Sequence, residues 1–387
     1  MNDSKLRLHI GFDAKRAANN VTGLGNYSRY TIAAMTALAP DYDYTLFVPK
    51  TGDTGRIDSF AALPNVKIAG LHGLPKCLGR AMWRTALMTN NLVSEGIDLY
   101  HGLSNEIPLT VNRSDVTSVV TVHDLIWRRM PADYNPIDRR LYDFKYGNSA
   151  KNADRIIAIS ECTKNDIVND FQVDPAKIDV IYQGIDPIFR HIPDTEADSV
   201  LQKYNIRGPY FIAVGTVQQR KNQLLAVKAL LQLPAEVRLV IVGRWHGGYA
   251  AEIDRFIRSN SLSDRVIRLQ NVPLTDLPAL YSRALFAAYP SRYEGFGLPV
   301  VEAIACHTPV IAAVGSCLEE AGGPGAVYVD PDDTDDFAAH ANRLMSNSFD
   351  ADKLVRNGLR HIRRFNPRDF VVSIKKTYQL AIISKFA

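Results

Sequence analysis

The stretch at residues 291–302, which reads SRYEGFGLPVVE, constrains the fold of this chain more than any other. It follows an apolar run at residues 284–289 that predicts a buried strand. It leads into residues 299–305, which predict a helix with proline in its first turn. A glycine-rich loop of this kind points backbone N–H groups and the positive end of a helix dipole at one place. The stretch therefore predicts a phosphate site at the edge of an α/β sheet.

Two glutamates, Glu294 and Glu302, bracket this loop. The first precedes the predicted helix, and the second lies within its first two turns. Carboxylates placed in this way can accept hydrogen bonds from hydroxyl groups on either side of a phosphate, as a nucleotide-sugar requires. The alternative is an ordinary loop with two solvated glutamates. Gly295, Gly297 and Pro299 favour the phosphate site, because they fall where it needs them.

The sequence of residues 291–302 resembles the E-x7-E motif of the retaining glycosyltransferases of family GT4, which have the GT-B fold. The resemblance covers nearly the whole chain and is strongest from Arg220 to Glu302. It implies two Rossmann-like domains whose parallel sheets face each other across a central cleft. The implied parts are an N-terminal acceptor-binding domain at 1–188, a C-terminal nucleotide-sugar-binding domain at 189–366, and a C-terminal helix at 367–387 that packs back on the N-terminal domain.

The composition agrees with two α/β domains. Of the 387 residues, 46% are apolar, which is enough for two buried cores, and 22% are charged, which makes long disorder unexpected. Predicted strands alternate with predicted helices along the chain, and this indicates parallel sheets. The net charge of +4 is small, so we expect no nucleic-acid partner. The 4 cysteines show no C-x-x-C spacing, so neither a disulfide framework nor a zinc site is expected.

We expect a cytoplasmic protein, because residues 1–7 are polar and no long apolar run follows. Peripheral contact with the inner face of the cell membrane is an open alternative. Two predicted helices, at 76–91 and 367–386, suggest this contact because they combine lysine or arginine with apolar residues. For both helices, packing against the protein is the preferred interpretation.

The N-terminal half opens with a predicted strand at residues 6–12, a polar loop at 14–23 and a helix from Gly25. This is the start of a Rossmann-like unit, although T-G-L-G is not the dinucleotide fingerprint. A tight turn is one interpretation of the glycines. The GT4 resemblance implies instead that Gly23, Leu24 and Gly25 face the acceptor and the donor phosphates.

His123 follows a strand predicted at residues 116–122. The carboxyl end of a parallel strand faces the crevice in which α/β sheets bind ligands, so a site is favoured over a structural role. The T-V-H-D-L sequence around His123 also resembles the corresponding segment of GT4 mannosyltransferases. That resemblance implies contact between His123 and the donor sugar.

Arg220 and Lys221 are predicted to open a helix after a strand at residues 210–214. The helix dipole disfavours cations at that end unless an anion binds there, and both side chains suit a diphosphate. Two solvated cations are the alternative. The segment resembles the GT4 pattern G-x-x-x-x-[RK]-K-[GN], which supports the diphosphate interpretation.

The resemblance also implies the remaining site residues. The candidate catalytic residues are Glu294, His123, Arg220 and Lys221. The candidate donor-binding residues are Gly215, Thr216, Arg220, Lys221, Gly243, Val272, Glu294, Gly295, Phe296, Gly297, Leu298 and Glu302.

We expect no metal ion and no cofactor, because the nucleotide-sugar is a substrate. An acidic cluster at residues 330–336 could suggest a metal. A helix predicted to follow it explains these aspartates equally well, because acids are ordinary in a first turn.

The implied activity is transfer of a sugar from a nucleotide donor to an acceptor hydroxyl, with the anomeric configuration retained. Mannose from GDP-mannose is the first choice, and a UDP- or dTDP-sugar is the alternative. The implied acceptor is a glycan or lipid-linked oligosaccharide of bacterial surface polysaccharide, such as lipopolysaccharide. A UDP-sugar epimerase of the same fold and a silent nucleotide-sugar-binding subunit are the other classes. Glu294→Ala and Lys221→Ala are expected to abolish transfer and leave the fold intact.

Overall fold

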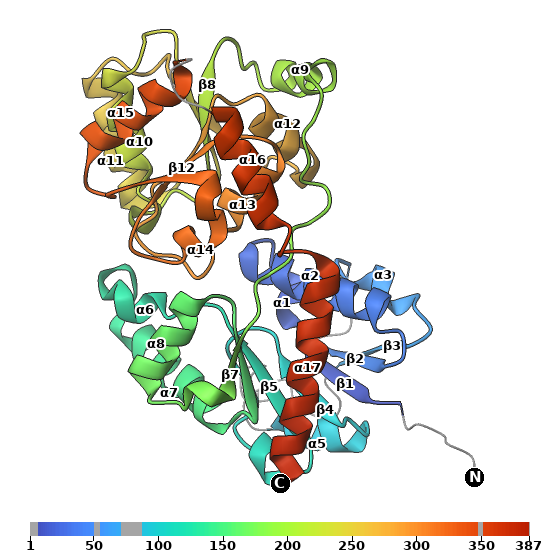
Figure 1. Ribbon diagram of the computed structural model, residues 1–387. Coiled ribbons are helices and arrows are strands. Elements are labelled where there is room, and N and C mark those ends of the chain that lie inside the picture. Colours follow the sequence, from blue (N-terminus) through green and yellow to red (C-terminus); the bar gives the residue numbers. More distant parts are fainter. Residues whose placement is uncertain (1–6, 50–54, 71–86, 347–350, 387) are drawn as a thin grey trace. The chain divides into compact units, whose positions relative to one another are not determined.

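The computed structural model describes residues 7–49, 55–70, 87–346 and 351–386. The chain divides into two compact units, of which the first comprises Met1–Gly184 with Phe365–Ala387 and the second Ile185–Arg364. Each unit is a parallel sheet with helices packed on it (Figure 1). This confirms the predicted pair of Rossmann-like domains.

The sheet of the first unit contains seven described strands in the order β3-β2-β1-β4-β5-β6-β7, and every pair is parallel. All six residues of β5, which lies between β4 and β6, are buried, as an apolar run predicts for a sheet covered on both faces. The strands are β1 (His9–Asp13), β2 (Asp43–Phe47), β3 (Val66–Ala69), β4 (Leu99–Gly102), β5 (Thr117–Val122), β6 (Arg155–Ala158) and β7 (Ile178–Val180).

Two helices of this unit, α7 (Pro136–Asn152) and α8 (Glu161–Phe171), begin at side-chain caps. Asn135 accepts the N–H of Ile137 at the start of α7, where Pro136 is the first helical residue. Ser160 accepts the N–H of Thr163 at the start of α8. The described helices are α1 (Lys15–Asn19), α2 (Gly23–Leu38), α3 (Asp58–Ala61), α5 (Met88–Ser94), α6 (Ile126–Arg129), α7 (Pro136–Asn152), α8 (Glu161–Phe171) and α17 (Pro367–Phe386).

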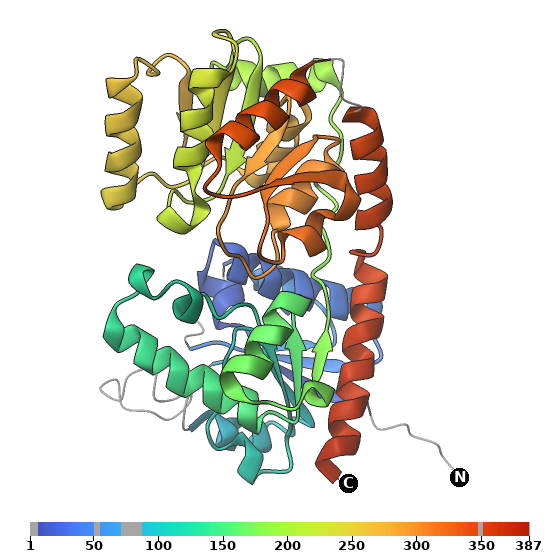
Figure 2. The ribbon, with the colours of Figure 1, turned by 60° about the vertical axis from the view of Figure 1, so that its left-hand side comes forward.

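The last helix, α17, returns to the first unit, as predicted. It contacts α2, β5 and β6, and Figure 2 shows it in red alongside the unit. The buried hydroxyl of Tyr378 lies 2.7 Å from Nδ1 of His101 in β4. Thr377 donates a hydrogen bond to Asp179 at 2.9 Å. Helix α17 therefore packs as part of the first unit.

The second unit has six described strands in the order β10-β9-β8-β11-β12-β13. The rings of Phe211 and Phe286 stack at 4.7 Å in its core. The strands are β8 (Tyr210–Val214), β9 (Arg238–Val242), β10 (Val266–Leu269), β11 (Ala287–Tyr289), β12 (Val310–Ala313) and β13 (Ala326–Val329). The helices are α9 (Asp194–Lys203), α10 (Gln223–Ala229), α11 (Gly247–Ser259), α12 (Leu277–Ser282), α13 (Leu298–Ala305), α14 (Leu318–Gly322), α15 (Thr334–Met345) and α16 (Ala351–Ile362).

The strand order of each sheet reverses next to its first strand. In the second unit this point lies between β8 and β11, which pair directly. Open parallel sheets bind ligands at the carboxyl ends of the strands at such a switch point. The loops that follow β8 and β11 are therefore the favoured site in this unit.

Two local predictions are wrong. Residues 14–23 are not a loop, because α1 forms there with Ala17 and Ala18 buried. Arg220 and Lys221 do not open a helix either. They lie in a 3-10 turn, Gln219–Lys221, and α10 starts only after Asn222, whose backbone is left-handed with φ 54°.

Two predicted helices, at 76–91 and 367–386, suggested contact with a membrane. Residues 76–86 of the first lie outside the described residues, and the described part that follows forms α5. The second is α17, which packs on the first unit. In the described part of the chain, no helix combines the length and the apolar character needed to span a bilayer.

Candidate active site

The loops after β8 and β11 bring one carboxylate against two cations. Oε1 of Glu294 lies 2.6 Å from Nη1 of Arg220 and 2.6 Å from Nζ of Lys221. The hydroxyl of Ser291 donates to the same oxygen at 2.5 Å. Because β8 and β11 are neighbours, the turn after one and the loop after the other leave the sheet at the same edge. We call these four side chains the Glu294 cluster.

Backbone bonds hold the cluster in place. Arg220 donates from Nη1 to the carbonyl of Tyr293 at 2.5 Å, and its own carbonyl accepts the N–H of Arg292 at 2.8 Å. The thiol of Cys317 donates to the carbonyl of Glu294 at 3.1 Å. The loop after β11 is therefore tied to the 3-10 turn by its main chain as well as by side chains.

The Glu294 cluster carries an excess positive charge. Burial alone would raise the pKa of Glu294, but the charges of Lys221 and Arg220 outweigh it and lower this pKa to about 2. Burial lowers the pKa of Lys221, and the carboxylate of Glu294 opposes that effect. One carboxylate thus faces two cations in a buried place. A phosphate oxygen would be attracted to this site, because Coulomb interactions are strong in a buried place.

Glu302 differs from Glu294 in its charge. It is half-buried in α13, and the hydroxyl of Tyr281 lies 3.5 Å from its Oε2. Burial raises its pKa to about 8, reinforced by Asp186 and opposed by Tyr281 and Lys221. At neutral pH the free protein therefore holds Glu302 protonated. The sequence analysis had treated both glutamates as carboxylates.

Glycines allow the loops to approach one another. Gly297 precedes α13 with φ 109°, and a Cβ there would lie 2.6 Å from Cδ2 of Leu318. A Cβ on Gly243, which follows β9, would lie 2.1 Å from the carbonyl oxygen of Gly215. The Cβ position of Gly215 is in turn 3.7 Å from Cε of Lys221. The ends of β8 and β9 therefore lie against each other, and Gly215 brings the end of β8 next to Lys221.

The other predicted donor-binding residues lie on loops that follow β8, β10 and β11 or at the start of α13. Thr216 follows Gly215, and its carbonyl accepts the side-chain N–H of Gln223 at 3.1 Å. Phe296 is 4% exposed, and Leu298 is the first residue of α13. Gly295 is buried between Glu294 and Phe296, and Val272 is half-buried on the loop after β10. These positions are compatible with the predicted site and do not test it.

His123 belongs to the first unit. Its Nε2 donates to the carbonyl of Leu103 at 2.8 Å, and its backbone N–H donates to Asn105 at 2.7 Å. Its ring meets that of Tyr27 edge-on at 4.6 Å. Burial lowers the pKa of His123 to about 4, with the Leu103 bond opposing and Arg16 reinforcing the shift. The ring is therefore neutral, with Nδ1 as an acceptor.

Gly23, Leu24 and Gly25 form the first turn of α2 and not the predicted loop. A Cβ on Gly25 would lie 2.0 Å from the carbonyl oxygen of Asn20, so the close approach of two backbones requires glycine there. The role of this turn toward acceptor and phosphates stays a prediction.

The acidic residues 330–336 are engaged locally. The side chain of Asp333 caps α15 by accepting the N–H of Asp336 at 2.8 Å. Asp330 accepts the N–H of Asp332, which pairs with Arg292. Nowhere in the described chain do three His, Cys, Asp or Glu side chains gather so that they could hold a metal ion.

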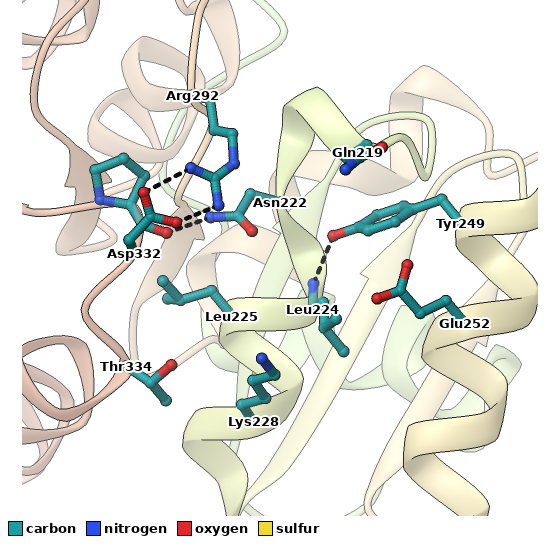
Figure 3. A pocket seen from close by; sticks show the side chains of 11 residues that line it. Gln219, Asn222, Leu224, Leu225, Lys228, Tyr249, Glu252, Arg292, Asp332 and Thr334 are labelled. Atoms are coloured by element: carbon teal, nitrogen blue, oxygen red, sulfur yellow. Dashed lines mark hydrogen bonds and ion pairs between the residues drawn. The ribbon is translucent and has the colours of Figure 1, made fainter. Parts of the chain in front are cut away.

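A pocket of about 160 Å³ lies beside the 3-10 turn. Figure 3 shows its walls, in which Arg292 pairs with Asp332 and Tyr249 accepts the N–H of Leu224 at 3.0 Å. Its described walls include none of the predicted site residues. Gln219 and Asn222, which flank Arg220 and Lys221, do line it.

Sequence reasoning missed Tyr289 and Ser291. The hydroxyl of Tyr289 is hydrogen-bonded to the ammonium of Lys221, which also lies 4.8 Å from the centre of the tyrosine ring. A signal was present, because Tyr289 ends the strand that the glycine-rich loop follows. A buried tyrosine at such a point needs a polar partner.

Comparisons with known proteins agree with the fold. The family described as Glycosyltransferase Family 4 matches residues 21–189, and the family described as Glycosyl transferases group 1 matches residues 197–361. Sucrose-phosphate synthase from Thermosynechococcus elongatus shares the fold with a TM-score of 0.77 at 21% identity, over 96% of this chain and 98% of that one. The chain is a glycosyltransferase with the GT-B fold and belongs to family GT4.

Two curated relatives are similar in sequence. O-antigen chain mannosyltransferase B from Escherichia coli is 28% identical over 289 residues, which are 73% of this chain and 74% of the relative. O-antigen chain mannosyltransferase RfbU from Salmonella typhimurium is 32% identical over 228 residues, which are 59% of each chain.

Proposed function

We propose that this protein transfers mannose from GDP-mannose to a hydroxyl of a glycan or lipid-linked oligosaccharide, with retention of configuration, in the synthesis of bacterial surface polysaccharide. The observation that carries the proposal is the excess positive charge of the Glu294 cluster at the switch point. Similarity to two proteins named O-antigen chain mannosyltransferases supports mannose. A UDP- or dTDP-sugar is the second candidate donor.

Departure of the nucleoside diphosphate is the difficult step, because negative charge grows on its phosphate as the sugar becomes oxocarbenium-like. Arg220 and Lys221 stabilise that charge when they bind phosphate oxygens in addition to Glu294. The N–H groups of Phe296, Gly297 and Leu298 are aimed at the same phosphates in this proposal. Loss of one such donor typically costs ~10²–10³ in rate.

The carboxylate of Glu294 holds hydroxyl groups of the sugar, since its low pKa keeps it an acceptor. Glu302 holds the ribose diol, and His123 orients the sugar as a neutral ring. The acceptor oxygen bonds to the anomeric carbon on the face from which the diphosphate leaves, and a phosphate oxygen takes the acceptor's proton. No protein nucleophile and no metal ion takes part, so a chelator should leave the rate unchanged.

The lipid-linked acceptor would bring the protein to an anionic membrane surface. Helix α7 exposes Ile137, Leu141 and Phe144 to 75%, 44% and 59% on one face, at the spacing i, i+4, i+7. Arg140, on the same helix, is also exposed. We expect the protein to float with phosphatidylglycerol vesicles, and a variant with serine at the three apolar positions to remain in solution. Equal flotation of both proteins would contradict the proposed contact between α7 and the membrane.

The donor is tested by thermal unfolding with GDP, UDP, dTDP and their sugars, because a ligand that binds the folded state raises the transition temperature. We expect GDP and GDP-mannose to raise it most. Turnover of GDP-mannose should require an acceptor, and proton NMR should show the product with the donor's anomeric configuration. Conversion of a UDP-sugar to its epimer without acceptor would favour the epimerase, and binding without turnover would favour the silent subunit.

A further inference from the structure

Tyr289 touches the Glu294 cluster from the sheet side. It is the last residue of β11 and only 6% exposed. Its hydroxyl is hydrogen-bonded to Nζ of Lys221, and the same Nζ lies 2.6 Å from Oε1 of Glu294. The ammonium also lies 4.8 Å from the centre of the tyrosine ring. Two of its three hydrogen-bond directions therefore have fixed partners.

We infer that Tyr289 is a positioning residue that orients the Lys221 ammonium toward the diphosphate of the donor, an inference that rests on the proposed function. An ammonium has three donors in tetrahedral arrangement. With two of them held by Tyr289 and Glu294, the third points in a fixed direction. A lysine side chain otherwise loses much rotamer freedom when it binds, so a preorganised ammonium binds anions more tightly.

By accepting a hydrogen bond from the ammonium, the tyrosine hydroxyl should also favour the charged form of Lys221. Burial disfavours the ammonium, so each partner that accepts its N–H supports the charged form. Removal of the hydroxyl should lower the pKa of Lys221 further. Among the described residues, the titratable or charged side chains that act on Lys221 include Glu294, Arg220, Cys317, Glu302 and Tyr289.

A pair of tyrosine variants separates positioning from structure. Tyr289→Phe removes the hydroxyl and keeps the ring. Tyr210→Phe is the matched control, because Tyr210 is 1% exposed at the start of the neighbouring strand β8 and donates to the carbonyl of Leu280 at 2.7 Å. Both variants lose one buried hydroxyl bond, but only Tyr289→Phe changes the Glu294 cluster.

The experiment measures the binding of inorganic pyrophosphate by calorimetry between pH 7 and pH 10, together with the pH profile of kcat/KM. We expect Tyr289→Phe to bind pyrophosphate about tenfold more weakly at pH 7, the size of one hydrogen bond to a charged group. We also expect it to lose affinity and kcat/KM at lower pH than wild type. Tyr210→Phe should follow wild type in both.

Three results would overturn the inference. If Tyr289→Phe matches wild type in affinity and pH profile, the hydroxyl does not orient Lys221, while the proposed function stands. If both variants weaken binding equally, the effect is structural. If wild type binds neither pyrophosphate nor any nucleotide, the proposed function fails together with the inference.

Discussion

At the scale of single residues, Glu294 compensates two buried cations as well as facing the donor. Glu294→Ala should therefore do more than abolish transfer. It leaves Arg220 and Lys221 without their shared carboxylate, and removal of one partner of a buried ion pair typically costs about 3–5 kcal/mol. This revises the expectation, drawn from the sequence, that the variant keeps an intact fold.

Urea unfolding followed by circular dichroism measures that cost. Lys221→Ala is the matched control, since it removes one of two cations and leaves the Glu294–Arg220 pair in place. It should abolish transfer at a much smaller loss of stability. Equal midpoints for wild type and Glu294→Ala would show that the carboxylate does not compensate the cations.

The raised pKa of Glu302 gives a pH dependence of stability. The folded state binds this proton up to about pH 8, whereas the unfolded chain releases it near the ordinary value of 4.5. The contribution of Glu302 to the free energy of unfolding is therefore fully present below about pH 4.5 and is lost as pH rises toward 8. Glu302→Gln should remove this component, as thermal unfolding at pH 5, 7 and 9 would reveal. An unchanged slope would place the titration elsewhere.

At the scale of elements, apolar runs predicted several boundaries to the residue. The strand Tyr210–Val214 and the helix Pro367–Phe386 lie where they were predicted. The predicted start of α10 was wrong, because a left-handed backbone conformation at Asn222 separates a 3-10 turn from the helix. An asparagine that adopts this conformation leaves no periodic signal in the sequence.

The loop between β11 and α13 depends on Gly297. Alanine there meets two obstacles, a backbone with φ 109° and a contact of 2.6 Å with Leu318. Gly315→Ala is a control for the first obstacle alone, since Gly315 has φ 89° and nothing within 4 Å of its Cβ position. We expect Gly297→Ala to lose about 2–4 kcal/mol of stability and Gly315→Ala about 1 kcal/mol. Equal losses in urea unfolding would mean that Leu318 moves aside freely.

At the scale of the whole molecule, the first unit needs the last helix. Ile374 of α17 is fully buried, whereas Val372, two residues earlier, is 61% exposed. Ile374→Ala should cost about 2–4 kcal/mol and Val372→Ala less than about 0.5 kcal/mol. Urea unfolding of the two variants measures the difference. Similar small losses would mean that α17 does not stabilise the unit it packs on.

The sequence did not predict the ion pairs that Glu294 forms with Arg220 and Lys221. The motifs identified each residue, but they assigned the cations to the diphosphate and the carboxylate to the sugar. The ion pairs arise because β8 and β11 are neighbours, which depends on strand order rather than on either motif. The raised pKa of Glu302 is likewise a product of the fold, because it comes mainly from burial of the carboxyl group.

The most direct test of the account is calorimetric titration of GDP-mannose into wild type and into the Arg220→Ala/Lys221→Ala double variant. We expect saturable binding to wild type and at least about a 100-fold loss of affinity in the variant, since each charge-assisted bond contributes about 1.5–3 kcal/mol. Thermal unfolding of the variant would check that it is folded. Equal affinity of the two folded proteins for GDP-mannose would contradict a diphosphate site at the Glu294 cluster.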